Sequence, residues 1–361
     1  MLVTCFHYSD PPDAVLVIEC CQAFHAWCRL PGGSLYGEES LTYSFSSKFC
    51  FKKLLCYIFL TKFENRGNIA RKMGESIKSG SKYWSEHKGY GPNWFTFFAG
   101  YIKECITGNP DLAPTPWAYQ TFVGKKPVEN MLEIGCLEGT KLVGMYEAGF
   151  TRAGVGVDVA AGAIERGQRK HSHLSGQIEL RVMDLNEPVL PQNTFDVVLA
   201  NGVLHHIEQL ESCLSNLYGC LKVGGYLFAS EFTGPSRYRY SEQSIELINR
   251  GRELLPNELR SATPFSPSKL AGKLAADPSE SIRSEELIDL VPKFFDRVII
   301  RPYGGNILAR ALDQTFFENF NPERSEHQSA VDRLIRYERG VLENGDPTHH
   351  AYFIAQRTQG H

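Results

Sequence analysis

The sequence predicts an α/β fold with a doubly wound, mainly parallel sheet, a C-terminal antiparallel strand pair and helical lid insertions. Two observations support this prediction. Between residues 128 and 232, short apolar runs alternate with segments of helical periodicity, which is the order expected of βαβ units. Beyond residue 232 the chain is polar over a long stretch before two further apolar runs follow. We expect the ligand crevice at the carboxyl ends of the parallel strands.

The alternating segment begins with an apolar run and keeps a regular order. Its expected strands are Val128–Ile134, Gly154–Val159, Ile178–Asp184, Phe195–Ala200 and Gly225–Phe232. Its expected helices are Thr140–Ala148, Ala161–Lys170 and Glu208–Leu221. Later helices are expected at Ser244–Leu255, Glu285–Val291, Ile307–Phe320 and Ala330–Leu342, and later strands at Phe294–Pro302 and Ala351–Gln356.

These changes of pattern divide the chain into five segments. They are a poorly patterned amino-terminal extension over 1–72, an aromatic helical segment over 73–126, the α/β core over 127–232, a helical substrate-lid insertion over 233–293, and the closing strands with a helical insertion over 294–361. The first segment lacks periodicity, so it is either a loosely folded extension or sequence upstream of a true start at Met73. The aromatic segment either packs in the core or closes as a flap over a pocket.

Composition excludes some classes of partner. The 361 residues are 42% hydrophobic and carry 38 Lys and Arg against 41 Asp and Glu, a formal net charge of −3. Without a strong positive field, we expect neither nucleic acid nor a membrane surface as a partner. Six of the ten cysteines lie in the first 56 residues without paired CxxC spacing, so we expect free thiols in a reducing cytoplasm.

A glycine turn and an acidic residue indicate a nucleotide-like ligand. Gly135 and Gly139 follow the first expected strand and allow a tight turn whose backbone N–H groups face a ligand. Asp158 ends the second strand about 20 residues later, where an acid that binds ribose hydroxyls is placed in such folds. A lone aspartate here would more often cap a helix, but the upstream turn favours the ribose role.

Further polar residues follow the third and fourth strands. Asp184 could accept a hydrogen bond from an adenine amino group, with Leu185 against the ring. Asn201 ends the fourth strand, and His205 and His206 follow it closely. Histidine is the side chain best suited to accept a proton near neutral pH, so one of the pair is a candidate base. We expect the other to pack or to cap.

Together these motifs over residues 131–232 resemble the class I, Rossmann-like, S-adenosylmethionine-dependent methyltransferases of the small-molecule type. The resemblance implies S-adenosyl-L-methionine as cofactor and a methyl transfer as the reaction. It implies that the methionine end lies against Glu133, Gly135 and Gly139, the ribose against Asp158, the adenine against Asp184 and Leu185, and the sulfonium near Asn201. It implies His205 as general base, with His206 as the rival. Leu137 departs from the family's usual glycine or small residue in the turn.

The acceptor is expected to be a small polar molecule, methylated at a hydroxyl of a sugar or another metabolite. Candidate substrate residues follow the fifth strand: Glu231, Arg237 and Tyr240. An arginine there could clamp a carboxylate or phosphate, and a tyrosine could stack on a ring. No His, Asp or Glu set has convincing metal-ligand spacing, so no metal is expected.

Two alternatives remain open. A nicotinamide-dependent oxidoreductase, using NAD or NADP, would also place an acid on ribose, but its turn has GxGxxG spacing rather than Gly-x-x-x-Gly. A non-catalytic methyltransferase-like scaffold would keep the fold without turnover. The retained acidic residues and histidines favour an enzyme. The sequence leaves the oligomeric state open.

Overall fold

The computed structural model describes residues 81–86 and 93–359. Residues 1–72 and the start expected at Met73 lie outside this range. By its internal contacts the chain divides into two units, Met1–Asn65 and Arg66–His361, and the following description concerns the second.

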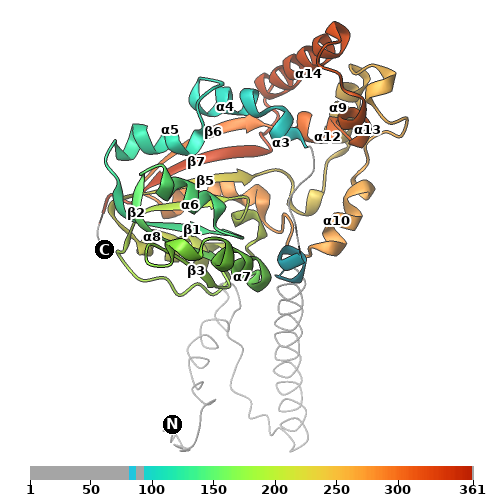
Figure 1. The fold of residues 1–361 in the computed structure, drawn as a ribbon. Helices are drawn as coiled ribbons and strands as arrows, with labels where there is room; N and C mark the ends of the chain where they lie inside the picture. The colour runs from blue at the N-terminus through green and yellow to red at the C-terminus, as the bar shows by residue number, and fades with distance from the viewer. Residues whose placement is uncertain (1–80, 87–92, 360–361) are drawn as a thin grey trace, which may run out of the picture. The chain divides into compact units, whose positions relative to one another are not determined.

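A seven-stranded sheet forms the centre of this unit, in the order β3-β2-β1-β4-β5-β7-β6 (Figure 1). The strands are β1 (Val128–Ile134), β2 (Thr151–Asp158), β3 (Ile178–Val182), β4 (Phe195–Asn201), β5 (Leu221–Phe232), β6 (Arg297–Gly304) and β7 (His350–Gln356). The first five are parallel, and β7 runs antiparallel to both β5 and β6. The predicted sheet with its closing antiparallel pair is confirmed. The chain changes direction across the sheet between β1 and β4, which is where such folds bind ligands.

Helices cover both faces of the sheet. Successive apolar side chains of β4 therefore point alternately into two different cores. Val197 and Leu199 belong to one apolar core, whereas Val198 and Ala200 belong to the other. A parallel strand covered on both faces reads as a continuous apolar run, and this is the pattern that made β4 recognisable. The helices of the αβ core are α6 (Thr140–Glu147), α7 (Ala161–Lys170), α8 (Leu210–Cys220) and α11 (Leu287–Phe294).

The remaining helices lie before β1 and in two insertions. Before β1 the chain forms α3 (Trp94–Phe97), α4 (Ala99–Thr107), α5 (Pro114–Ala118) and a π-helical turn at Tyr119–Val123. The first insertion, between β5 and α11, carries α9 (Glu242–Glu253) and α10 (Ala271–Ala276); the second, between β6 and β7, carries α12 (Leu308–Ala311), α13 (Gln314–Asn319) and α14 (Ser325–Glu343). Short 3-10 turns occur at Ser172–Leu174, Leu204–His206, Ser236–Tyr238, Asn257–Leu259, Pro267–Leu270 and Ser284–Glu286.

Two expected helices differ from those in the structure by more than three residues at one end or by a break, whereas the bounds of the others agree within three residues. The single helix expected over Ile307–Phe320 is broken between α12 and α13, because the Asp313 side chain accepts the Thr315 N–H and starts a new helix. The same carboxylate pairs with Arg252 at 2.8 Å, which fixes the break from outside the segment. The final helix begins earlier than expected, at Ser325.

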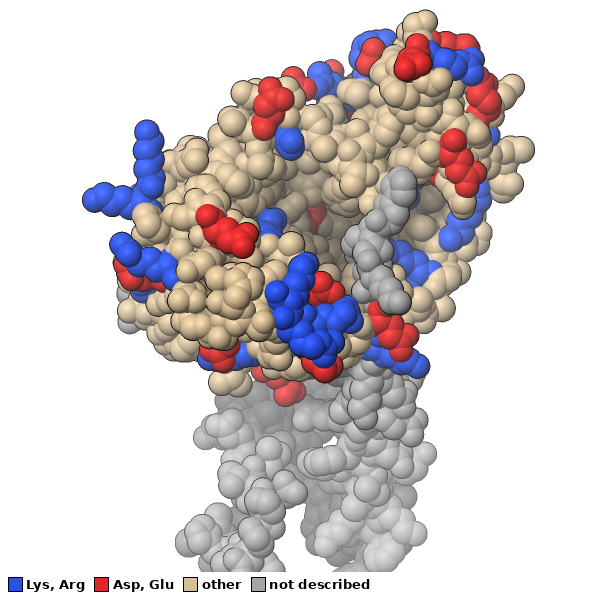
Figure 2. All heavy atoms as spheres, viewed as in Figure 1, with Lys and Arg blue, Asp and Glu red and all other residues tan. Residues whose placement is uncertain are grey.

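Other observations bear on the expected class of protein. Among the helices in the described ranges, none is both long and apolar enough to cross a membrane. The four cysteines within the described ranges are free thiols, as expected: Cys105, Cys136, Cys213 and Cys220. Figure 2 shows acidic and basic side chains mixed over the visible face, which is hollowed near its centre.

Candidate active site

A cavity of about 530 Å³ opens at the carboxyl ends of the parallel strands, a volume typical of small-molecule sites. Its lining brings together many of the residues predicted from the sequence: Gly135, Asp158, Asp184, Leu185, Asn201, His205, His206 and Glu231. These residues come from the ends of β1, β2, β4 and β5 and from the segments that follow β3 and β4. Four other predicted residues are not part of the lining: Glu133, Gly139, Arg237 and Tyr240.

The turn after β1 is shaped by glycine and held by Asp158. Gly135 has a φ of 63°, and a Cβ on it would lie 2.5 Å from the Val203 side chain, so a larger residue would clash. One oxygen of Asp158, Oδ2, accepts the Leu137 N–H at 2.8 Å, and Oδ1 accepts the Ala160 N–H at 2.8 Å. Burial raises the pKa of Asp158, although these backbone donors oppose the rise. The carboxylate thus ties the end of β2 to the turn.

Glu133 and Gly139 act behind the turn rather than in the cavity. The buried Glu133 carboxylate accepts the Leu142 N–H at 3.0 Å, in the first turn of α6. Gly139 has a φ of 72°, and a Cβ on it would lie 2.7 Å from Leu180. The expected contact of these two residues with a ligand stays a prediction, because the structure shows only their contacts within the protein. They set the path of the backbone.

Asp184, Leu185 and Asn201 line the same cavity. Asp184 Oδ1 accepts the Asn186 N–H at 2.8 Å, so the carboxylate is held by its own turn. Asn201 accepts a hydrogen bond from Lys141 through Oδ1, while its Nδ2 is buried without a partner in the described part of the chain. A buried donor without an acceptor is costly, so a ligand atom that accepted this hydrogen bond would be favoured.

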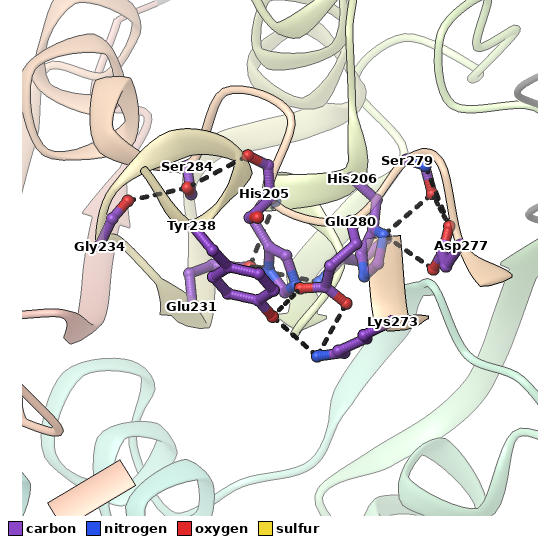
Figure 3. A network of polar contacts seen from close by, with 12 residues as sticks. His205, His206, Glu231, Gly234, Tyr238, Lys273, Asp277, Ser279, Glu280 and Ser284 are labelled. Carbon is purple, nitrogen blue, oxygen red and sulfur yellow. Dashed lines mark hydrogen bonds and ion pairs between the residues drawn. The ribbon is translucent and has the colours of Figure 1, made fainter. Parts of the chain in front are cut away.

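His205 is held between two carboxylates (Figure 3). Its Nδ1 donates to Glu231 Oε2 at 2.8 Å, and its Nε2 lies 3.7 Å from Glu280 Oε1. Glu231 is 1% exposed, and its Oε1 also accepts the N–H groups of Val203 and Leu204 at 3.0 Å. Burial by itself lowers the pKa of His205, but the hydrogen bond and charge of Glu231, with the charge of Glu280, raise it above its usual value.

His206 has a different environment from its neighbour. Its Nδ1 lies 3.0 Å from the Ser279 hydroxyl and 3.5 Å from Asp277 Oδ2. Its ring packs edge-on against Trp84. Burial, followed by the positive charge of His205, lowers the pKa of His206 to about 4. His206 is therefore neutral near pH 7, and its contacts are those of a packed residue.

The first insertion supplies residues of the cavity lining that were not predicted from the sequence. Glu280, only 3% exposed, accepts a hydrogen bond from the Tyr238 hydroxyl at 2.7 Å and pairs with Lys273 at 2.9 Å (Figure 3). Burial by itself raises the pKa of Glu280. The charges of His205, His206 and Lys273 lower it by more than burial raises it, so the pKa of this carboxyl lies below its usual range. The segment has no periodicity and lies far from the histidines in the sequence, so no sequence signal marked Glu280.

His205, His206 and Glu280 also form a group with ligand atoms within 4.8 Å of one another. Spacing along the sequence gave no such set, because Glu280 comes from the distant insertion. Both oxygens of Glu280 are engaged, by the Tyr238 hydroxyl and by the Lys273 ammonium. We therefore interpret this group as part of a hydrogen-bonded network.

Arg237 and Tyr240 were expected to contact the substrate, but neither residue is part of the cavity lining. Arg237 donates from Nη1 to the Pro278 carbonyl and so holds the first insertion. The Tyr240 hydroxyl accepts a hydrogen bond from Arg310 Nε at 2.7 Å. The cationic side chains that line the cavity are Lys273 and Arg310. The anion clamp expected at Arg237 stays a prediction, and these two cations are further candidates for that role.

Residues 132–229 match the family described as a methyltransferase domain. This segment is a methyltransferase domain. The match begins in β1 and ends in β5, so it covers the glycine turn, Asp158, Asp184, Asn201 and both histidines. For this domain, the predicted family, enzyme class and cofactor, S-adenosyl-L-methionine, are confirmed. The match supports neither the oxidoreductase nor the scaffold alternative.

Similar proteins share the methyltransferase domain rather than the whole chain. The hybrid PKS-NRPS synthetase apdA of Emericella nidulans is 30% identical over 128 residues, which is 34% of this chain and 3% of that protein. Phosphoethanolamine N-methyltransferase 3 of Arabidopsis thaliana is 26% identical over 129 residues, which is 36% of this chain and 26% of that protein. The chain thus spans about a quarter or less of the length of these relatives.

Among solved structures, the geranyl diphosphate C-methyltransferase from Streptomyces coelicolor A3(2) is 12% identical, with a TM-score of 0.45. The alignment covers 78% of this chain and 97% of that one. That protein was solved in complex with Mg²⁺, geranyl diphosphate and S-adenosyl-L-homocysteine.

Proposed function

We propose that this chain transfers a methyl group from S-adenosyl-L-methionine to a hydroxyl of a small polar acceptor. One observation carries the proposal: the Gly135 turn with Asp158 and the His205–Glu231 pair line the same cavity. The first pair is suited to hold a nucleoside, and the second is suited to accept a proton. Methyl transfer to a hydroxyl needs both functions side by side.

The cofactor half of the cavity would be built by residues of the parallel strands. Asp158 would accept the ribose hydroxyl protons, because a carboxylate retains free lone pairs after accepting two backbone N–H groups. Asp184 and Leu185 would contact the adenine, and the unpartnered Nδ2 of Asn201 would donate to the bound ligand near the reacting centre. When bound, the cofactor supplies an electrophilic methyl group on a sulfonium.

The acceptor half would be organised by His205. Because Nδ1 donates to Glu231, Nε2 is the nitrogen left to accept the proton of the acceptor hydroxyl. Glu231 fixes the tautomer and stabilises the imidazolium that forms, as an orienting carboxylate does for other histidine bases. A base of this kind contributes about 10² to 10⁴ in rate. His206, with its lowered pKa, ranks second for this role.

The test compares two substitutions in the full chain. Asp158→Ala should abolish the binding of S-adenosyl-L-methionine measured by calorimetry. His205→Ala should leave that binding intact and lower turnover by about 10² to 10⁴. Turnover is measured with methyl-labelled cofactor and a fractionated extract of small metabolites. Asp289→Ala, at an exposed position on α11, is the matched control and should change neither quantity.

The outcomes separate the proposal from its rivals. Tight NAD binding without S-adenosyl-L-methionine binding would favour the oxidoreductase alternative. Unchanged cofactor affinity in Asp158→Ala would contradict the assigned ribose site. Unchanged turnover in His205→Ala would move the base to His206 or remove it from the mechanism.

A further inference from the structure

Arg310 is a cavity arginine without an acidic partner. It lies on α12, is partly buried, and lines the cavity. Its guanidinium carbon lies 4.8 Å from the centre of the Tyr238 ring and 5.8 Å from that of Tyr240. No carboxylate of the described residues forms an ion pair with it. Arg252, on the adjacent α9, shows the usual arrangement, since it pairs with Asp313 at 2.8 Å.

The charge of Arg310 lowers the pKa of two buried histidines nearby, His349 and His350. Burial, followed by the charge of Arg310, lowers the pKa of His349 to about 3 and holds the pKa of His350 well below its usual range. Both rings are therefore neutral near pH 7. A buried charge is normally paired, so this end of the cavity carries a positive charge that lacks its counter-ion.

His350 adds a hydrogen-bonding group at the same place. Its ring lines the cavity and packs against Trp94, with ring centres 4.7 Å apart. Its Nδ1 is buried on the side of Gly305 and, within the described ranges, has no hydrogen-bond partner. The neutral ring thus retains an N–H donor for a ligand.

Lys273, the other cationic side chain of the cavity lining, differs from Arg310 because its charge is neutralised by a carboxylate. Its ammonium pairs with Glu280 at 2.9 Å and donates to the Tyr238 hydroxyl at 2.8 Å (Figure 3). Of the two cavity cations in the described chain, Arg310 is therefore the one that carries unbalanced charge. Its binding partner should be an anion from outside the chain.

Aromatic side chains connect Arg310 with the candidate base. The Phe232 ring centre lies 6.1 Å from that of His205, 5.2 Å from that of His350 and 5.5 Å from that of Tyr238. Tyr238 in turn contacts Arg310. Arg310 and the base are thus connected through two aromatic rings, Phe232 and Tyr238, and both line the same cavity of about 530 Å³, a volume typical of small-molecule sites.

We propose that the methyl acceptor is a small organic anion whose carboxylate or phosphate group binds the Arg310 guanidinium, with His350 as a second donor. This inference rests on the proposed function, because it names the acceptor class of the same cavity. The planar guanidinium forms charge-assisted, often bidentate, hydrogen bonds with either group. Anchoring there places the hydroxyl of the acceptor beside His205.

The experiment uses the full chain loaded with S-adenosyl-L-homocysteine and measures binding by calorimetry. The probes are 4-hydroxybenzoate, 4-hydroxyphenyl phosphate and the neutral 4-hydroxybenzyl alcohol. In the wild type, at least one anion should bind tenfold or more tightly than the neutral probe, and the two anionic probes distinguish carboxylate from phosphate. Arg310→Gln should weaken anion binding by about tenfold to a hundredfold and leave the neutral probe unchanged.

Arg301→Gln is the matched control, because Arg301 is an exposed arginine over the Trp117 ring, outside the cavity lining. It should leave anion binding unchanged. Equal binding of anionic and neutral probes in the wild type, no anion binding, or unaltered anion affinity in Arg310→Gln would overturn the inference. The wild-type comparison decides even if the variant does not fold. Failure to bind S-adenosyl-L-homocysteine would instead be a failure of the proposed function.

Discussion

Two adjacent histidines acquire different properties from their partners. His205 has its Nδ1 proton held by Glu231, whereas His206 faces Ser279 and Asp277. Their pKa values consequently move in opposite directions. The sequence placed both at the end of a strand but could not rank them, because Ser279 and Asp277 come from an insertion that has no sequence pattern linking it to the strand.

The pair formed by His205 and Glu280 predicts a pH effect. A general base works in its neutral form, and His205 has a raised pKa. As the pH is lowered, turnover should therefore begin to fall at a higher pH than it would with an ordinary histidine as the base. Glu280→Gln removes a carboxylate that raises this pKa and leaves the Lys273 charge, which lowers it, without a partner. The pKa of His205 should fall, and the acid limb of kcat/KM should move to lower pH.

The measurement is kcat/KM between pH 5 and pH 8.5 for the wild type and the variant. Glu231 remains in both, so the variant should retain a base and a bell-shaped or half-bell profile. Glu286→Gln is the control, since Glu286 pairs with Arg283 outside the cavity lining. An acid limb that moves to higher pH, or does not move, would show that Glu280 does not act on His205.

The predicted residues that line the cavity at its cofactor end, as proposed, share one property. Asp158, Asp184 and Asn201 all lie at or just after the ends of parallel strands, and the topology gathers those ends at one edge. Arg237 and Arg310 lack this property, because both lie in insertions whose path no periodicity defines. The sequence pattern therefore suggested Arg237 as a candidate for binding an anion and did not mark Arg310.

At the level of elements, the turn between β1 and α6 contains an unusual residue. Leu137 has a φ of 48°, in the left-handed region, and lines the cavity. A non-glycine residue there costs about 1–2 kcal/mol relative to the right-handed region. The departure noted in the sequence, a leucine where related turns have a small residue, is therefore also a site of backbone strain.

Leu137→Gly should relieve that strain. Glycine loses about 0.5–1 kcal/mol in conformational entropy, so the net gain in the free energy of unfolding should be at most about 1 kcal/mol. Denaturant unfolding measures it, and calorimetry should show that cofactor affinity does not fall. Gly149→Ala, at a φ of 75° with open space around the glycine, is the opposite control and should destabilise. A loss of stability in Leu137→Gly would show that the leucine packing outweighs the strain.

Elements were predictable where one local pattern decided them. The five parallel strands were found from apolar runs because helices bury both of their faces. The break between α12 and α13 was not found, because the Asp313 cap that starts the new helix is fixed by an ion pair with Arg252 from another helix. A long-range ion pair of this kind leaves no local signature.

For the whole described unit, the two halves of the cavity have different origins in the chain. The cofactor half lies within the matched domain at 132–229, whereas Glu280 and Arg310 come from the two insertions that follow it. Figure 1 shows α12 and α14 of the second insertion beyond the β6 side of the sheet. The family match covers the proposed cofactor half alone, so our proposal assigns acceptor selection to the insertions.

One buried carboxylate links three separate segments of this arrangement. Glu338 on α14 is fully buried, and its oxygens accept the N–H groups of Gly305, Ile307 and Leu308 at 2.9–3.0 Å. The Tyr101 hydroxyl of α4 lies 3.4 Å from the same group. The N–H groups belong to the turn that starts α12, so Glu338 holds the helix that carries Arg310.

Glu338→Ala should destabilise the fold by about 3–5 kcal/mol, because three buried N–H groups lose their acceptor at about 1–3 kcal/mol each before relaxation. Glu338→Gln keeps one acceptor oxygen and should cost less. Glu343→Ala, exposed at the end of the same helix, should be nearly neutral. Denaturant unfolding gives the three values. If Glu338→Ala cost no more than Glu343→Ala, the helix carrying Arg310 would be held by apolar packing alone, and the carboxylate would have no structural role.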